Sequence, residues 1–156
     1  MDFLFQHILM TVMHMKNSKE LLTEVYKTIL EEKSRIHSVL DACTNPSFRK
    51  ALESQMREYD SIECEACTIA SQRSWDLPEP DPVKQFFSNL LTRMKMSRSN
   101  CDSRIAGMLI LTNTKSMVKG LKCLHQYPHP NDRISCICQK LLDSETVIIR
   151  SMQDFL

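Results

Sequence analysis

Apolar residues recur every three or four positions along most of the chain, the spacing that places them on one face of an α-helix. Four such stripes run over residues 22–43, 48–69, 83–124 and 134–156. Short segments rich in Pro, Asn and Asp separate the stripes. Four long amphipathic helices with short connections predict an all-α fold, an antiparallel four-helix bundle without strands.

Several helix starts are marked by side chains that bind free backbone N–H groups. Asn17 followed by Glu20 has the spacing of a capping box, which predicts that the first bundle helix begins there. Asn45 precedes Pro46, so a cap is followed by a residue that suits the first helical turn. The same reasoning places the later helix starts at Asp81-Pro82 and at Asn131.

The third stripe contains a weak point. Thr112, Asn113 and Thr114 offer side chains that compete for the backbone hydrogen bonds of a helix. We therefore predict a bend or break in the third helix near residues 112–116. Before this helix, three prolines within residues 76–82 predict a stiff, extended connection.

Residues 1–16 differ from the rest of the chain. Apolar side chains cover more than one helical face there, so the segment has to be buried against something. One possibility is an extra core helix, and another is an arm that docks on a second copy. A membrane-surface helix has the least support, because Lys16 is the only basic residue. We assign residues 1–16 to a docking or dimer arm and residues 17–156 to a single four-helix-bundle domain.

Composition excludes several classes of protein. The 156 residues suit one domain, and only 2 of them are Gly, too few for the loops of Rossmann, P-loop or α/β-hydrolase proteins. No apolar run approaches the length of a membrane span. The net charge of +1 argues against a nucleic-acid partner. The basic run at 84–104 has two interpretations, a nucleic-acid patch or packing beside the acidic residues at 53–65, and we favour the second.

The chain has seven cysteines, an odd number at irregular spacing, which is a poor disulfide framework. Free cysteine packs as a small apolar residue and is typical of a reducing compartment. Cys43, Cys101 and Cys138 fall on the apolar stripes, where they fill the core. We therefore expect the protein to be cytoplasmic.

Residues 25–43 (VYKTILEEKSRIHSVLDAC) and 48–59 (FRKALESQMREY) resemble part of a group of small uncharacterised bacterial proteins, mostly from clostridia and their relatives. Later parts of the chain that resemble the same group are 103–114, 119–127 and 144–156. The resemblance covers residues 20–156 in order. It implies a ferritin-like four-helix fold, but it implies no activity, because one fold supports many functions.

A di-iron bundle needs inward-facing Glu residues and Glu-x-x-His pairs, and the chain contains no such pair. The family resemblance directs attention to Arg104 and Gly107 for ligands on the third helix, and neither side chain suits a cation. Three acids beside the stripes remain as candidates for iron or another divalent metal: Glu32, Glu63 and Glu145.

Glu145 is in phase with the core positions of the last helix. A buried carboxylate needs a partner, because its transfer from water is costly. One interpretation is a metal ligand or an acid–base residue, and the other is a structural hydrogen bond. The structural partners in reach of the same layer are Tyr59, Gln55 and Lys33.

Taken together, the sequence favours a non-enzymatic structural or interaction protein without a cofactor. We expect it to form a homo-oligomer, such as a dimer, through residues 1–16. The alternative is a degenerate ferritin-like metal-binding or redox protein that uses the carboxylates of the bundle core.

Overall fold

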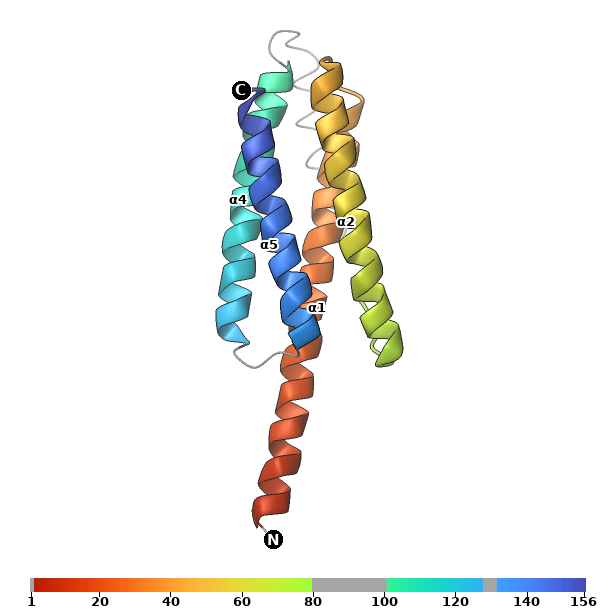
Figure 1. Cartoon of the computed structure of the whole chain (residues 1–156), viewed down its shortest axis with the longest axis vertical. Helices are drawn as coiled ribbons and strands as arrows, with labels where there is room; N and C mark the ends of the chain where they lie inside the picture. Colours follow the sequence, from red (N-terminus) through yellow and green to blue (C-terminus); the bar gives the residue numbers. More distant parts are fainter. Residues whose placement is uncertain (1, 80–100, 128–131) are drawn as a thin grey trace.

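The computed structural model describes residues 2–79, 101–127 and 132–156. Four long helices make up most of these residues, labelled as in Figure 1: α1 (Asp2–Leu40), α2 (Pro46–Gln72), α4 (Cys101–Gln126) and α5 (Asp132–Gln153). The described part of the chain contains no β-strand. The prediction of an all-α protein with four packed helices is confirmed.

The helices lie side by side along one long axis (Figure 1). α1 and α5 run toward the upper end of the bundle, whereas α2 and α4 run toward the lower end. α1 contacts α2 and α4, and α5 contacts the same two helices from the other side. These four contacts join antiparallel helices, whereas α1 and α5, which also contact each other, run in the same direction, as do α2 and α4.

Asn45 caps α2 as predicted. Its side-chain oxygen accepts hydrogen bonds from the backbone N–H groups of Ser47 (2.8 Å) and Phe48 (3.4 Å), and Pro46 occupies the first helical position. The predicted start at Asn17 is wrong, because α1 continues through this residue from Asp2. The predicted starts at 81–82 and 131 lie outside the described residues.

The predicted break near residues 112–116 is also wrong, because α4 is helical throughout this segment. The hydroxyls of Thr112 and Thr114 donate to carbonyls one turn earlier, at 3.2 and 2.7 Å. The side-chain amide of Asn113 donates to the Leu109 carbonyl in the same way (2.8 Å). These side chains find their partners inside the helix and do not need to interrupt it.

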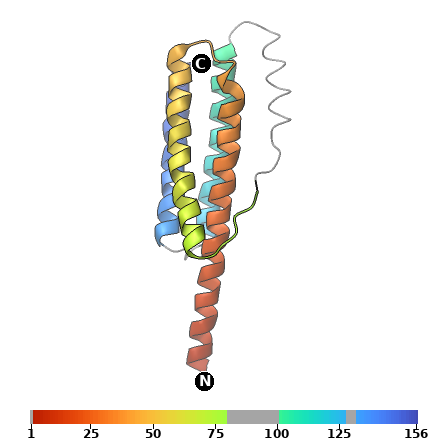
Figure 2. The same ribbon diagram turned by 90° about the vertical axis from the view of Figure 1, so that its right-hand side faces the viewer.

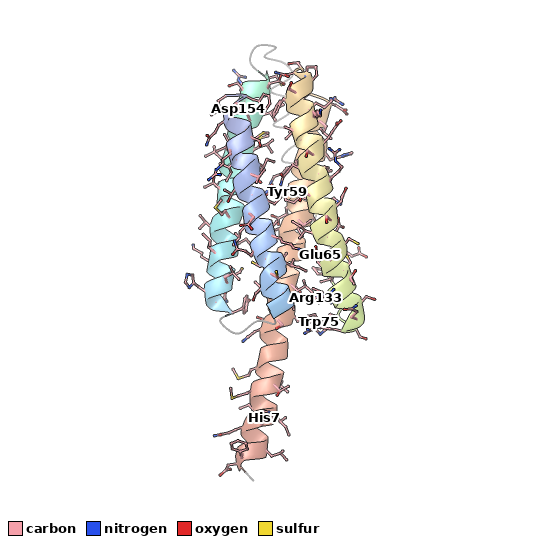
Figure 3. The ribbon with its side chains drawn as sticks, in the orientation of Figure 1. His7, Tyr59, Glu65, Trp75, Arg133 and Asp154 are labelled. Carbon is pink, nitrogen blue, oxygen red and sulfur yellow. The ribbon has the colours of Figure 1, made fainter. Side chains whose placement is uncertain are left out.

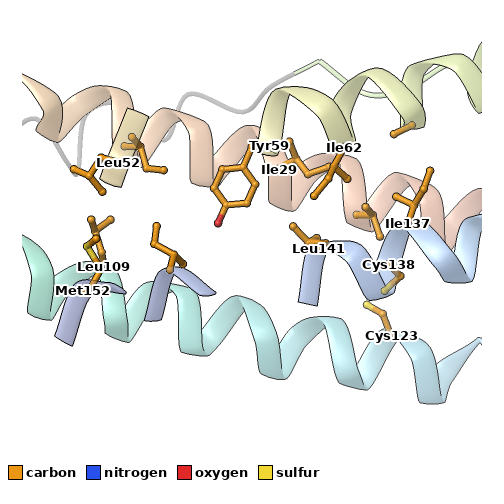
Figure 4. Packing of buried hydrophobic residues seen from close by; sticks show 14 of the residues in the cluster. Ile29, Leu52, Tyr59, Ile62, Leu109, Cys123, Ile137, Cys138, Leu141 and Met152 are labelled. Atoms are coloured by element: carbon orange, nitrogen blue, oxygen red, sulfur yellow. The ribbon is translucent and has the colours of Figure 1, made fainter. Parts of the chain in front are cut away.

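The core lies between the four helices where they pack together, and Figure 4 shows part of it. Phe48 and Phe155 close its upper end with ring centroids 4.7 Å apart. α4 and α5 approach closely at Gly120, where an added Cβ would lie 2.9 Å from Leu142 Cδ2. Cys123 on α4 and Cys138 on α5 are both buried, and their side chains face each other between these two helices (Figure 4).

Residues 2–13 form the first part of α1 and are called the N-terminal arm. The arm projects beyond the lower end of the other helices in two perpendicular views (Figures 1 and 2). Every side chain in it is exposed. The segment is helical as expected, but the possibility that it forms an extra core helix of the same chain is wrong. Ser18 is the first buried residue of α1 among those whose side chains are described.

Candidate functional site

Two of the three predicted acids lie in the bundle core. Glu32 on α1 is 0% exposed and Glu145 on α5 is 1% exposed. Helical spacing explains both positions, because Glu32 follows Ile29 by three residues and Glu145 follows Leu141 by four. The face that each helix buries therefore carries one carboxylate into the interior.

Glu32 is bound by two polar groups. Its Oε1 accepts hydrogen bonds from the Arg35 guanidinium on the same helix and from the Ser116 hydroxyl on α4. Its Oε2 has no hydrogen-bond partner among the described residues. Burial raises the pKa of Glu32 above its ordinary value, although Arg35 and Ser116 act in the opposite direction.

Glu145 is held less firmly. Neither carboxylate oxygen has a hydrogen-bond partner within the described part of the chain. Burial, followed by the charge of Glu32, raises the pKa of Glu145 to about 9, while Arg35 and the nearby Tyr59 hydroxyl lower it. Glu145 is therefore protonated at neutral pH, which removes the cost of burying its charge.

The Tyr59 hydroxyl points into the middle of the core (Figure 4). It donates to Asn113 Oδ1 at 3.0 Å rather than to Glu145. Burial raises the pKa of Tyr59 well above its ordinary value, and the charges of Glu145 and Glu32 add to this effect. Tyr59 therefore stays a neutral hydrogen-bond donor and does not supply a phenolate.

These residues belong to a buried polar layer to which each helix contributes at least one side chain. Its members are Glu32, Gln55, Tyr59, Asn113, Ser116, Ser144 and Glu145. Gln55 Nε2 donates to Ser144 Oγ at 2.6 Å, so this amide pairs with α5 without using Glu145. Tyr59 is the only one of the three predicted structural partners that approaches Glu145.

Glu63 does not join this layer. It is partly exposed on α2 and forms an ion pair with Lys33, which also binds Asp60 at 2.6 Å. Lys33 is thereby turned toward α2 and away from Glu145. The three predicted carboxylates therefore do not form one site. Glu32 and Glu145 are buried in the core, whereas Glu63 belongs to an ion pair at the surface.

Sequence reasoning missed Asn113, Ser116 and Ser144 of this layer, and also Arg35, which binds Glu32. Asn113, which the sequence predicts to weaken the helix, follows Leu109 by four positions and is 0% exposed. Ser116 continues the same stripe toward Cys123. Arg35 follows Glu32 by three residues, the spacing of an ion pair on one helix, and this signal was available in the sequence.

A metal centre of the kind found in di-iron bundles does not fit these residues. Such a centre uses four Glu and two His side chains, whereas the layer offers two carboxylates, one of them bound to a guanidinium. No group of three or more His, Cys, Asp or Glu side chains suited to a metal occurs among the described residues. A proton on Glu145 balances the charges of the layer as it stands.

A second candidate site is the surface of the N-terminal arm. It carries large apolar side chains that are 51–85% exposed: Phe3, Leu4, Phe5, Ile8, Leu9, Met10, Val12 and Met13. His7 lies on the arm well away from the bundle (Figure 3). Single exposed apolar residues are common on proteins, but a contiguous set of this size marks an interaction surface.

Asp102, an acid on α4, has a structural role. Asp102 at the start of α4 accepts hydrogen bonds from the Thr44 backbone and from the Asn45 backbone, at 2.9 and 2.8 Å. It therefore fixes α4 to the loop between α1 and α2. Most of the basic run at 84–104 lies outside the described residues.

No protein-family model matches the chain, and neither a curated protein nor a solved structure matches it. The resemblance to ferritin-like bacterial proteins therefore stays a prediction. Among the described helices, none has the length and apolar character needed to cross a membrane.

Proposed function

We propose that this protein is a non-enzymatic structural or interaction protein that associates with a second copy of itself through the N-terminal arm. The observation that carries the proposal is the exposed apolar surface of the arm, on a helix that extends past the bundle. Water disfavours such a surface, and burial of a large apolar side chain contributes about 1.5–3 kcal/mol.

The size of the surface suits a dimer. If docking buries about half of each exposed side chain, one arm removes on the order of 500 Å² of apolar surface from water. A symmetric dimer has two arms, so it buries on the order of 1,000 Å² of arm surface. This is the lower limit of the area that specific protein interfaces bury. The pairing of identical subunits about a two-fold axis is also the commonest form of assembly.

The continuity of α1 supports an intermolecular contact. The arm and the bundle part of α1 belong to one uninterrupted helix, Asp2–Leu40. To fold the arm back onto its own bundle would break this helix and lose its backbone hydrogen bonds. No described residue of the same chain covers the arm, so we assign its cover to another molecule.

We also propose that the bundle has a ferritin-like architecture. The support is the order of helix directions, in which α2 and α4 run the same way and α5 returns. Ferritin-like bundles contain one long connection that produces such an order. The seven unpaired cysteines support a reducing location such as the cytoplasm.

Size-exclusion chromatography with light scattering tests the self-association. We expect the full chain to be a dimer, and the double variant Ile8→Glu, Val12→Glu to have a dissociation constant at least tenfold higher. Thr11→Glu is the matched control, because Thr11 lies on the same arm but on another side of the helix. A monomeric wild-type protein at micromolar concentration contradicts the proposal, as does association that is unchanged without residues 1–16.

The alternative is a metal-binding or redox protein that uses Glu32, Glu63 and Glu145. Its support is limited to the carboxylate oxygens of Glu32 and Glu145 that lack partners in the described part of the chain. Aerobic addition of Fe(II), followed by metal analysis of the untagged protein, tests it. Iron uptake that is lost in Glu145→Gln supports this alternative, and no uptake by the wild-type protein contradicts it.

A further inference from the structure

The arm has one face that is richer in apolar side chains than the others. Phe5, Ile8, Leu9 and Val12 have the i, i+3, i+4, i+7 spacing of a helical docking stripe. At 3.6 residues per turn, this stripe is turned about 150° from the stripe that α1 buries in its own bundle. The arm face is therefore a separate surface and does not continue the stripe that packs in the bundle core.

A groove on the bundle is the candidate surface for the arm of a second copy. It lies between α2 and α5 and has a volume of about 630 Å³. Its walls contain several small side chains, Ala51, Ser54, Ser61, Ser144 and Ser151. Small residues allow the backbone of a docking helix to approach closely.

Val147 is the exposed apolar residue of this groove. It is 59% exposed on α5, among lining residues that are otherwise small, polar or largely buried. The Lys140–Glu65 ion pair, 2.7 Å long, joins the two helices across the lower part of the groove. Glu65 and Arg133 both lie on the side where α2 and α5 meet (Figure 3).

The arm has the length to reach this groove in a second copy. The arm itself spans about 18 Å, and the helix from Asp2 to Asn17 about 24 Å, at about 1.5 Å per residue. The arm leaves the bundle at the end where α2 stops and α5 starts (Figure 1). From this end, Glu65 lies about 10 Å along α2 and Val147 about 22 Å along α5.

Two copies that meet at their arm ends, related by a two-fold axis, bring each arm alongside the lower half of the other bundle. Each copy then supplies one arm and one groove, so the interface is reciprocal and closes as a dimer. The continuous α1 helix prevents the arm from entering the groove of its own chain.

We infer that the groove between α2 and α5 is the docking site for the arm of a second copy of this chain, with Phe5 of the arm nearest to Val147 and Ile8, Leu9 and Val12 packed along the groove below it. This inference rests on the proposed self-association and specifies its geometry. The competing arrangement, in which two arms pair with each other, leaves the groove open.

Variants of the full-length chain separate the two arrangements. Val147→Glu places a charge in the groove without disturbing the core, since this side chain is exposed. We expect it to raise the dimer dissociation constant at least tenfold in analytical ultracentrifugation. Leu111→Glu is the matched control on α4, because Leu111 is also an exposed apolar residue (66%) but does not line the groove. Circular dichroism and thermal unfolding verify that each variant keeps its fold.

A mixing experiment adds an independent measure. The Val147→Glu chain retains a functional arm, and the Ile8→Glu, Val12→Glu chain retains a functional groove. We expect a mixture of the two to form a heterodimer that is tighter than either homodimer, because one arm–groove contact is restored.

The outcomes distinguish this inference from the proposed function. If Val147→Glu dimerises like the wild type while the arm variant is monomeric, the arms pair with each other and only the inference is overturned. If Leu111→Glu weakens the dimer as strongly as Val147→Glu, the inference is likewise overturned. A monomeric wild-type chain overturns both.

Discussion

Glu32 and Glu145 are both buried in the core, but Arg35 binds Glu32, and Glu145 has no hydrogen-bond partner among the described residues. The two acids therefore differ in how well their surroundings stabilise a negative charge. Glu32 has a cation and a hydroxyl to stabilise a carboxylate, whereas Glu145 faces the negative charge of Glu32. A single proton on Glu145 resolves the repulsion, as in other pairs of acids that share a buried site.

The protonation of Glu145 makes the stability depend on pH. Its pKa is about 9 in the folded protein, against an ordinary value of 4.5, so folding takes up a proton between these values. The contribution is fully present below pH 4.5 and is lost as the pH rises toward 9. We expect the free energy of unfolding, measured by urea denaturation, to fall from pH 6 to pH 9.

The groups that face Glu145 are Glu32 and Arg35 from α1 and Tyr59 from α2, with the uncharged Asn113 and Ser116 on α4. Glu145→Gln removes the titration while keeping the shape of the side chain. The fall in stability from pH 6 to pH 9 should be clearly smaller in this variant. An equally steep fall in Glu145→Gln and the wild type would assign the pH dependence to other groups.

Replacement of each buried acid by leucine should have opposite effects. Glu145→Leu replaces a neutral acid whose oxygens lack partners, so we expect the free energy of unfolding to rise by about 1–2 kcal/mol. Glu32→Leu leaves the Arg35 guanidinium without its buried carboxylate and should cost about 2–3 kcal/mol, since Glu31 at 3.5 Å retains part of the pairing. Denaturation at pH 7 measures both values, and a larger loss in Glu145→Leu than in Glu32→Leu would contradict this account.

Much of the bundle could be predicted from the sequence because hydrophobic periodicity is a local signal. The four stripes, the Asn45 cap and the burial of Glu145 each depend on neighbouring residues of one helix. The start predicted at Asn17 failed because a capping-box spacing is equally compatible with the interior of a helix. Nothing between residues 2 and 17 interrupts the helix, since this segment contains neither Gly nor Pro.

The candidate site was predicted only in part, because its members meet across helices. Glu32 and Glu63 both lie at the edge of a stripe, and their own helices do not decide which of them is buried. Partners on neighbouring helices determine which of the two is buried. Ser116 of α4 binds Glu32, whereas Lys33 of α1 forms an ion pair with Glu63 at the surface. Such contacts depend on the relative rotation of two packed helices, which a single sequence does not reveal.

Asp102 should contribute to stability through the loop between α1 and α2. Its carboxylate also accepts a hydrogen bond from the Thr44 hydroxyl at 2.8 Å. Burial alone would raise the pKa of Asp102, but the hydrogen bonds from Thr44 and Asn45 outweigh it and lower the pKa below its ordinary value. Because these bonds resemble those of a helix cap, we expect Asp102→Ala to lower the free energy of unfolding by about 1–2 kcal/mol.

The lowered pKa gives this prediction a pH signature. The contribution of the Asp102 charge is present above its ordinary pKa of 3.8 and is lost as the pH falls through the folded value. Asp102→Asn keeps the size of the side chain and serves as the control, with a smaller loss expected than for alanine. Equal stability of Asp102→Ala and the wild type at pH 7 would show that the contact has no energetic role.

The cysteines should differ in their reactivity according to their place in the bundle. Cys136 and Cys138 lie two residues apart on α5, so one faces solvent and the other faces α4. Burial, followed by the effect of Cys123, raises the pKa of Cys138 to about 11, and the reactive form of a cysteine is the thiolate. We expect N-ethylmaleimide to modify Cys136 at least tenfold faster than Cys138 in the native protein at pH 7.5, with the rates read by peptide mass spectrometry. In denaturant the two rates should become similar, and native rates that are already equal would contradict the packing of α5 against α4.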